Sequence, residues 1–97
     1  MASFTTRILL KGNPEESEYD LLYSEMEKRG FDRTIESDTG TVYNLPNAEY
    51  NLMGSFTRSE VLNLAREAVD TLQNRAAEIL VTESKGRSWH NLAKIYD

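Results

Sequence analysis

Apolar residues recur with a helical period in the second half of the chain. From Thr57 to Asn74 they are spaced three and four residues apart, which places them on one face of a helix. The members of this stripe are Val61, Leu64, Ala65, Ala68, Val69 and Leu72. Thr57 and Glu60 have the spacing of a capping box, in which each side chain accepts a hydrogen bond from the backbone of the other residue. The pattern predicts an amphipathic helix that begins after Thr57.

A second helical pattern covers Glu15 to Arg29. Its apolar positions are Tyr19, Leu22, Tyr23 and Met26. Acidic residues crowd its first turns, whereas Lys28 and Arg29 occupy the last turn, and the helix dipole favours this charge order. Gly30 follows, as expected for a left-handed C-terminal cap. We therefore expect a helix that ends at Arg29.

Other segments have the alternation of apolar and polar residues that is typical of strands. They span residues 4–11, 31–37, 48–56 and 77–83, and residues 41–46 are also extended in character. The sequence Asp38-Thr39-Gly40 signals a turn, and Pro46 disfavours a central strand. The region between the two helices is thus expected to be an antiparallel pair with an elaborated connection.

Residues 88–96 fit a short C-terminal helix with Ser88 as its N-cap. Its apolar face would contain Trp89, Leu92, Ala93 and Tyr96. The complete order is β-α-β-β-α-β plus a tail, which is the ferredoxin-like pattern. We expect a single α+β domain over residues 1–97: a four-stranded antiparallel sheet, two helices on one face, and the short C-terminal helix.

Composition narrows the functional classes. The 97 residues include 16 acidic and 11 basic side chains, a formal net charge of −5, and this balance opposes non-specific attraction to phosphate backbones. There is no cysteine and a single histidine, so the sequence predicts no metal centre and no cofactor. No apolar run approaches the ~18 residues of a membrane span, and the start lacks a secretory signal pattern. We expect a cytoplasmic protein that does not contact a membrane.

A sheet with both helices on one face leaves its other face in water. Alternation places Arg7, Leu9, Met53 and Leu80 on that face. Exposed apolar side chains of this kind usually mark a contact surface. The expected interface residues are Leu9, Met53, Leu80, Trp89 and Tyr96, in a homodimer formed by sheet faces or by exchanged tails. The alternative is that the tail covers its own sheet.

Basic residues gather in two places. Lys28, Arg29 and Arg33 surround the end of the first helix, and Lys85 and Arg87 follow the last strand. Either group could hold a phosphate. The simpler interpretation is that the first group matches the helix dipole and that the second is a solvated turn.

One stretch resembles a known family. It includes Gly30-Phe31, Ile35 and the run from Asp38 to Tyr50, and is followed by Thr57-Arg58-Ser59-Glu60-Val61. In these residues the chain resembles the small family of the antitoxin GhoS. The resemblance implies a ferredoxin-like fold related to CRISPR-associated nucleases. It also implies a sequence-specific endoribonuclease activity on the messenger RNA of a small membrane toxin.

Two functional hypotheses follow. In the first, the protein is a GhoS-like antitoxin that cleaves single-stranded RNA, and Arg29 and Arg33 are catalytic because they stabilise the phosphate in the transition state. Its RNA-binding residues would be Arg7, Lys11, Lys28, Lys85 and Arg87. In the second, it is a non-catalytic protein-binding module, an accessory regulator or inhibitor in a toxin–antitoxin or phage–host conflict system. On the residues alone, the acidic balance and the absence of a recognisable carboxylate pair favour the second, whereas the resemblance to the GhoS family favours the first and brings the two close to even.

Overall fold

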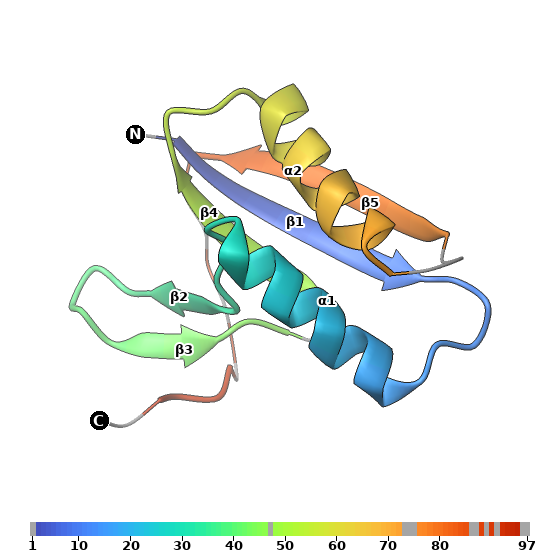
Figure 1. Ribbon diagram of the computed structural model, residues 1–97. Helices are drawn as coiled ribbons and strands as arrows, with labels where there is room; N and C mark the ends of the chain where they lie inside the picture. The colour runs from blue at the N-terminus through green and yellow to red at the C-terminus, as the bar shows by residue number, and fades with distance from the viewer. Residues whose placement is uncertain are drawn as a thin grey trace.

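The protein folds into an α+β structure, which a computed structural model describes for residues 2–46, 48–72, 76–85, 88, 90 and 92–95. Its elements are β1 (Ala2–Leu10), α1 (Glu16–Lys28), β2 (Thr34–Glu36), β3 (Val42–Asn44), β4 (Glu49–Gly54), α2 (Arg58–Asp70) and β5 (Ala77–Ser84). Both helices lie on one face of the sheet β4-β1-β5, and the β2–β3 hairpin projects beside it (Figure 1). The predicted α+β class is confirmed.

The main sheet is antiparallel, with β1 at its centre. Alternation along β1 turns Phe4, Thr6, Ile8 and Leu10 toward the helices, where all four are buried. The core contains Phe4, Ile8, Leu10, Leu22, Met26, Phe31, Tyr50, Leu52, Val61, Ala65, Ala68, Val69 and Leu72. The apolar stripes predicted for both helices thus supply its helical side, although Leu64, Tyr19 and Tyr23 are only partly buried.

The boundaries of both helices follow from local chemistry. The Thr57 hydroxyl accepts a hydrogen bond from the Glu60 N–H at 3.1 Å, and the Glu60 carboxylate accepts one from the Thr57 N–H at 2.8 Å. These bonds satisfy two backbone donors that would otherwise lack partners at the helix start. At the other helix, α1 ends before Gly30, whose φ of 92° favours glycine. Both predicted helix signals are confirmed.

The predicted four-stranded sheet is not formed as one unit. The chain after α1 meets β4 at a single bridge, in which Asp32 and Asn51 exchange backbone hydrogen bonds of 2.8 and 2.7 Å. It then leaves the sheet, and β2 pairs with β3 instead. The cause is local: the Ser37–Thr41 turn brings β3 directly against β2, so this pairing closes a much shorter loop than a longer pairing with β4. The result is a three-stranded and a two-stranded sheet.

The predicted C-terminal helix is wrong for the described tail residues. Instead, the tail runs antiparallel to β3, with Lys94 opposite Tyr43. The Asn44 N–H donates to the Ala93 carbonyl at 2.8 Å, and the Ile95 N–H donates to the Val42 carbonyl at 2.9 Å. The outer edge of β3 presents backbone groups that need partners, and the tail satisfies two of them. Trp89 and Tyr96 lie outside the described residues.

Removal of the α2 cap gives a direct test of this local account. We expect Thr57→Ala to lower the free energy of unfolding by about 1 kcal/mol, because the Glu60 N–H loses its acceptor. Urea denaturation measures the change. Ser59→Ala is the matched control, because Ser59 is exposed in the same turn of the helix. Equal stability of Thr57→Ala and the wild type would contradict the capping role.

Candidate functional site

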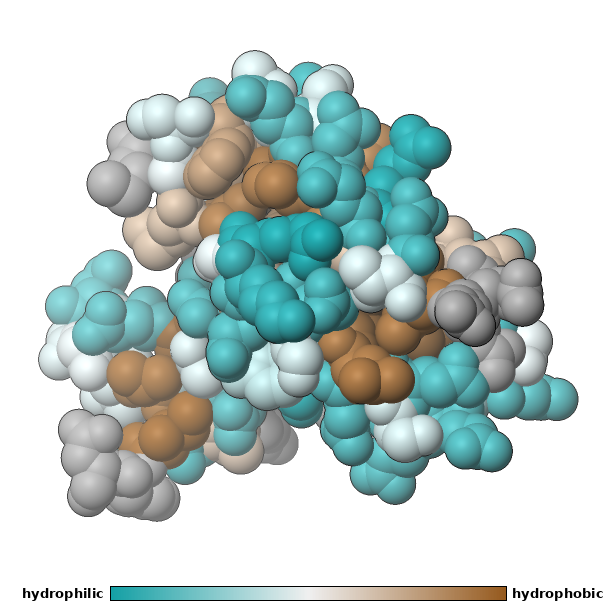
Figure 2. Space-filling view, viewed as in Figure 1, coloured by the Kyte–Doolittle hydropathy of each residue, from teal (hydrophilic) through white to brown (hydrophobic). Residues whose placement is uncertain are grey.

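An open groove lies between the outer face of the main sheet and the β2–β3 hairpin. It has a volume of about 1030 Å3. In Figure 2 the molecule is hollowed on the left, between the hairpin and the part that carries the helices. The hollow exists because the chain leaves β4 after the Asp32–Asn51 bridge and does not continue the sheet.

Strand register determines the floor of the groove. Met53 of β4, Ser3 of β1 and Ser84 of β5 are direct neighbours across the sheet. In the next row, Asn51 neighbours Thr5. The floor is therefore polar except for Met53, and a polar floor is suited to hydrogen bonding with an extended chain.

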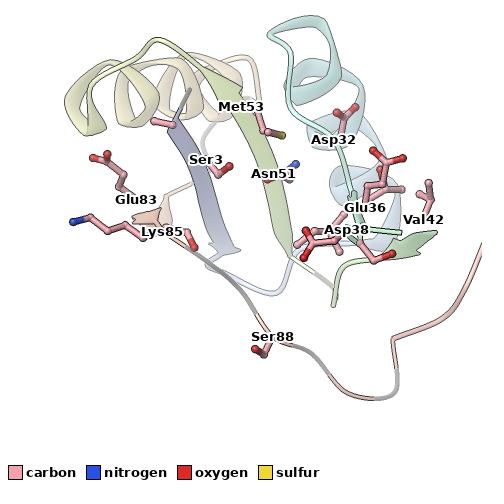
Figure 3. A pocket seen from close by; sticks show the side chains of 15 residues that line it. Ser3, Asp32, Glu36, Asp38, Val42, Asn51, Met53, Glu83, Lys85 and Ser88 are labelled. Atoms are coloured by element: carbon pink, nitrogen blue, oxygen red, sulfur yellow. The ribbon is translucent and has the colours of Figure 1, made fainter. Parts of the chain in front are cut away.

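The β2–β3 hairpin forms one wall of the groove, and hydrogen bonds in its turn stabilise it. The Thr41 N–H donates to the Ser37 hydroxyl at 3.1 Å, and the Gly40 N–H donates to the Ser37 carbonyl at 2.9 Å. Gly40 has a φ of 86°, a conformation that glycine adopts without strain. This turn positions Glu36 and Asp38 at the groove, and Lys85 and Ser88 line it from the chain that follows β5 (Figure 3).

The described residues that line the groove carry mainly negative charge. Among the described residues, its lining contains the carboxylates of Asp32, Glu36 and Asp38 and the amine of Lys85. Glu83 also borders the groove, but it pairs with Phe4, so its side chain lies on the helix face of the sheet. Figure 3 shows Glu83 and Lys85 on one side and the hairpin carboxylates on the other. A concave surface with charges of one sign concentrates the field, so it attracts cationic groups and repels phosphates.

The basic side chains proposed for RNA chemistry lie elsewhere. Lys28 and Arg29 both bind Glu25, at 2.8 and 3.2 Å. The hydrogen bond from Lys28, and then that from Arg29, lower the pKa of the Glu25 carboxyl group. Both cations at the end of α1 therefore have a carboxylate neighbour on their own helix.

Arg33 contacts an aromatic ring. Its guanidinium carbon lies 4.7 Å from the centre of the Tyr23 ring, within the range of a cation–π interaction. A hydrogen bond with Glu27 raises the pKa of Tyr23, burial raises it further, and Arg33 opposes the change. The two proposed catalytic arginines thus have different partners: Glu25 for Arg29 and Tyr23 for Arg33.

Apart from Lys28 on α1, the described residues proposed to bind RNA are spread along the sheet. Lys85 follows Ser84, which pairs with Ser3 at the start of β1, whereas Lys11 follows the other end of β1. The eight-residue separation of Ser3 and Lys11 corresponds to about 26 Å in an extended strand. Lys11 pairs with Glu78 at 3.5 Å, and Arg7 lies between Glu49 and Leu80 on the outer face. Arg87 lies outside the described residues.

The predicted interface residues on the sheet are exposed, but they are not one patch. The exposed fractions of Leu9, Met53 and Leu80 are 45%, 54% and 64%. Leu9 and Leu80 occupy neighbouring rows, whereas Met53 lies beside Ser3, at the other end of β1. The described tail residues leave these three side chains exposed, so they do not seal this face of the sheet.

Sequence reasoning did not identify the groove. The pattern assigned Asp32 and Glu36 to a strand and Asp38 to a turn, without a shared surface. The turn sequence at residues 38–40 and Pro46 together predicted an elaborated connection between the strands. They did not indicate that this connection would form a separate hairpin beside the sheet.

In the described part of the chain, no three side chains of the types His, Cys, Asp and Glu are grouped in a way that could hold a metal ion. Neither helix of that part has the length and hydropathy of a membrane span.

No protein-family model matches the chain, and no curated protein sequence matches it significantly. The resemblance to the GhoS family therefore stays a prediction.

Near Arg33, Tyr50 provides a test of burial. Burial raises the pKa of its hydroxyl group, and Arg33 acts in the opposite direction. As the pH rises, the Tyr50 hydroxyl therefore loses its proton at a lower pH in the unfolded chain than in the folded protein. Tyr50 contributes its full stabilisation below about pH 10, and this contribution is lost as the pH rises above that value.

Tyr50→Phe should remove this part of the alkaline loss of stability. Urea denaturation between about pH 8 and pH 11 measures the slope of the unfolding free energy against pH. Tyr43→Phe, on β3 and outside the core, is the control. An unchanged slope in Tyr50→Phe would contradict the assigned cause.

Proposed function

We propose that the protein is a non-catalytic binding module that takes a positively charged segment of a partner protein into the acidic groove. The observation that carries this proposal is the lining: among the described residues, three carboxylates and one amine border an open hollow with a largely polar floor. The volume of about 1030 Å3 is at the upper end of ligand pockets, which span roughly 300–1,000 Å3. A few side chains of an extended peptide fill such a space.

Charge determines the class of partner. A lysine or arginine in the groove meets Asp32, Glu36 or Asp38, whereas the phosphates of RNA meet the same carboxylates as like charges. Pairs of this kind contribute modestly to affinity, but they accelerate association and select against partners of the wrong charge. Because Asp32, Glu36 and Asp38 are exposed to solvent, added salt should weaken binding.

The biological role that fits this surface is that of an accessory regulator or inhibitor in a toxin–antitoxin or phage–host conflict system, acting in the cytoplasm. The resemblance to the GhoS family supports that setting. A ferredoxin-like origin is part of the proposal. Its support is the order β-α-β-β-α-β, which remains when β3 is counted as part of the connection, and the central place of β1.

RNA cleavage is the second candidate. One observation favours it: Lys28, Arg29 and Arg33 lie within six residues at and after the end of α1, and Arg33 lies over the Tyr23 ring. In this candidate Arg33 would move from the ring to a phosphate. Cleavage of a panel of single-stranded RNAs, abolished by Arg33→Ala, would establish it in place of the binding module.

Charge reversal in the groove tests the proposed function. Fluorescence anisotropy is measured with two labelled probes, an extended peptide rich in Lys and Arg and a single-stranded RNA of similar length. The wild type should bind the peptide and not the RNA. Glu36→Lys with Asp38→Lys should weaken peptide binding about tenfold or more, equivalent to ~1.4 kcal/mol.

The control has the same change of charge outside the groove. Glu67→Lys with Asp70→Lys alters two exposed carboxylates of α2, neither of which lines the groove. This variant should bind the peptide within about twofold of the wild type. Equal losses in both double variants would show attraction to net charge alone and would overturn the groove as the site.

A further inference from the structure

We propose that two copies of the chain join through the free edge of β5 into a continuous six-stranded sheet. β5 is the terminal strand of the main sheet, and no other segment of the described chain pairs along its outer side. The strand contains neither proline nor glycine over Ala77–Ser84. Natural edge strands are usually protected from pairing by proline, charged side chains, bulges or a covering segment. β5 has no proline and no bulge, and its charged side chains are Glu78 and Glu83.

The hydrogen-bond pattern shows which backbone groups face this edge. The Lys11 N–H donates to the Ala76 carbonyl, so the backbone N–H and C=O groups of Ala76 point toward β1. The direction of these backbone groups alternates along a strand, so those of residues 78, 80, 82 and 84 also point toward β1. The N–H and C=O groups of Ala77, Ile79, Val81 and Glu83 therefore point outward, where a second strand can bind them.

Side-chain faces restrict the register. Residues that are opposite in an antiparallel pair must share a face of the sheet, and a twofold axis makes the contact self-complementary. With the axis at Leu80, Ile79 is opposite the second copy's Val81, and Glu78 is opposite its Thr82. Ala77 is opposite Glu83 in the same register, so no two carboxylates face each other. All four outward-pointing residues then have outward-pointing partners.

The same register places apolar surface together on both faces. Leu80, with 64% of its surface exposed, meets its own copy as a non-hydrogen-bonded pair, the kind in which side chains approach most closely. Leu9 lies in the neighbouring row and extends this contact. On the helix face, Ile79 and Val81 are only partly buried against the core, and the second strand would cover their remaining surface.

A hollow beside the strand leaves room for the partner. It has a volume of about 470 Å3 and is lined by Val81, Thr82 and Glu83 of β5, by Lys85, and by Arg58 at the start of α2. In the proposed register the Ala77–Ile79 segment of the second copy lies along these β5 residues.

Sedimentation equilibrium from micromolar to millimolar concentration tests the proposal. The wild type should approach twice the mass of one chain. Leu80→Lys should raise the dissociation constant of the dimer at least tenfold, because two ammonium groups would face each other at the axis. Leu21→Lys is the control, since Leu21 on α1 is 59% exposed and lies away from β5, and it should leave the dissociation constant unchanged. A monomer at every concentration would overturn the proposal.

Amide hydrogen exchange distinguishes edge pairing from other dimers. The Leu80 amide points toward β1 and should be protected at all concentrations. The Ile79 and Val81 amides point outward, so they should become protected only where the dimer forms. A dimer in which these two amides exchange as they do in the monomer would place the interface elsewhere, on the sheet faces or the tails, and would overturn the β5 assignment. Failure of the groove to bind peptide would leave these results unaffected.

Discussion

Two backbone hydrogen bonds between Asp32 and Asn51 connect the hairpin to the main sheet. Phe31, immediately before the bridge, is fully buried and packs edge-to-face against Tyr50, with 6.4 Å between the ring centroids. The chain is thus fixed at the bridge and free to diverge after it. Divergence opens the groove, and the pairing of the tail with β3 holds the hairpin from its other side. The functional surface therefore depends on where strand pairing stops.

The placement of charge separates this surface from the basic residues. Lys28 and Arg29 bind Glu25, and Arg33 lies over Tyr23, so the cations at the end of α1 already have partners. The carboxylates of Glu36 and Asp38 are instead positioned by a turn whose hydrogen bonds involve Ser37. This division supports a protein that receives cations in the groove more than one that seats an RNA backbone.

Much of the fold could be predicted because it depends on local rules. The α2 stripe, the Thr57–Glu60 cap and the inward face of β1 each follow from periodicity or from residues a few positions apart. The hairpin and the tail could not be predicted in this way. Whether residues 34–36 pair with β4 or β3, and whether residues 92–95 form a helix or bind a strand edge, is a competition between distant partners. The groove results from that competition. Its carboxylates are therefore brought together by the fold and do not form a recognisable sequence motif.

Nuclear magnetic resonance of the 15N-labelled protein, titrated with the Lys- and Arg-rich peptide, tests the central claim most directly. The claim predicts that amide shifts change in residues 32–38, 51–53 and 83–85, which form the walls and floor of the groove, and that added salt reverses them. Changes confined to the end of α1, or equal changes when single-stranded RNA replaces the peptide, would contradict the account of the protein as a module for cationic partners.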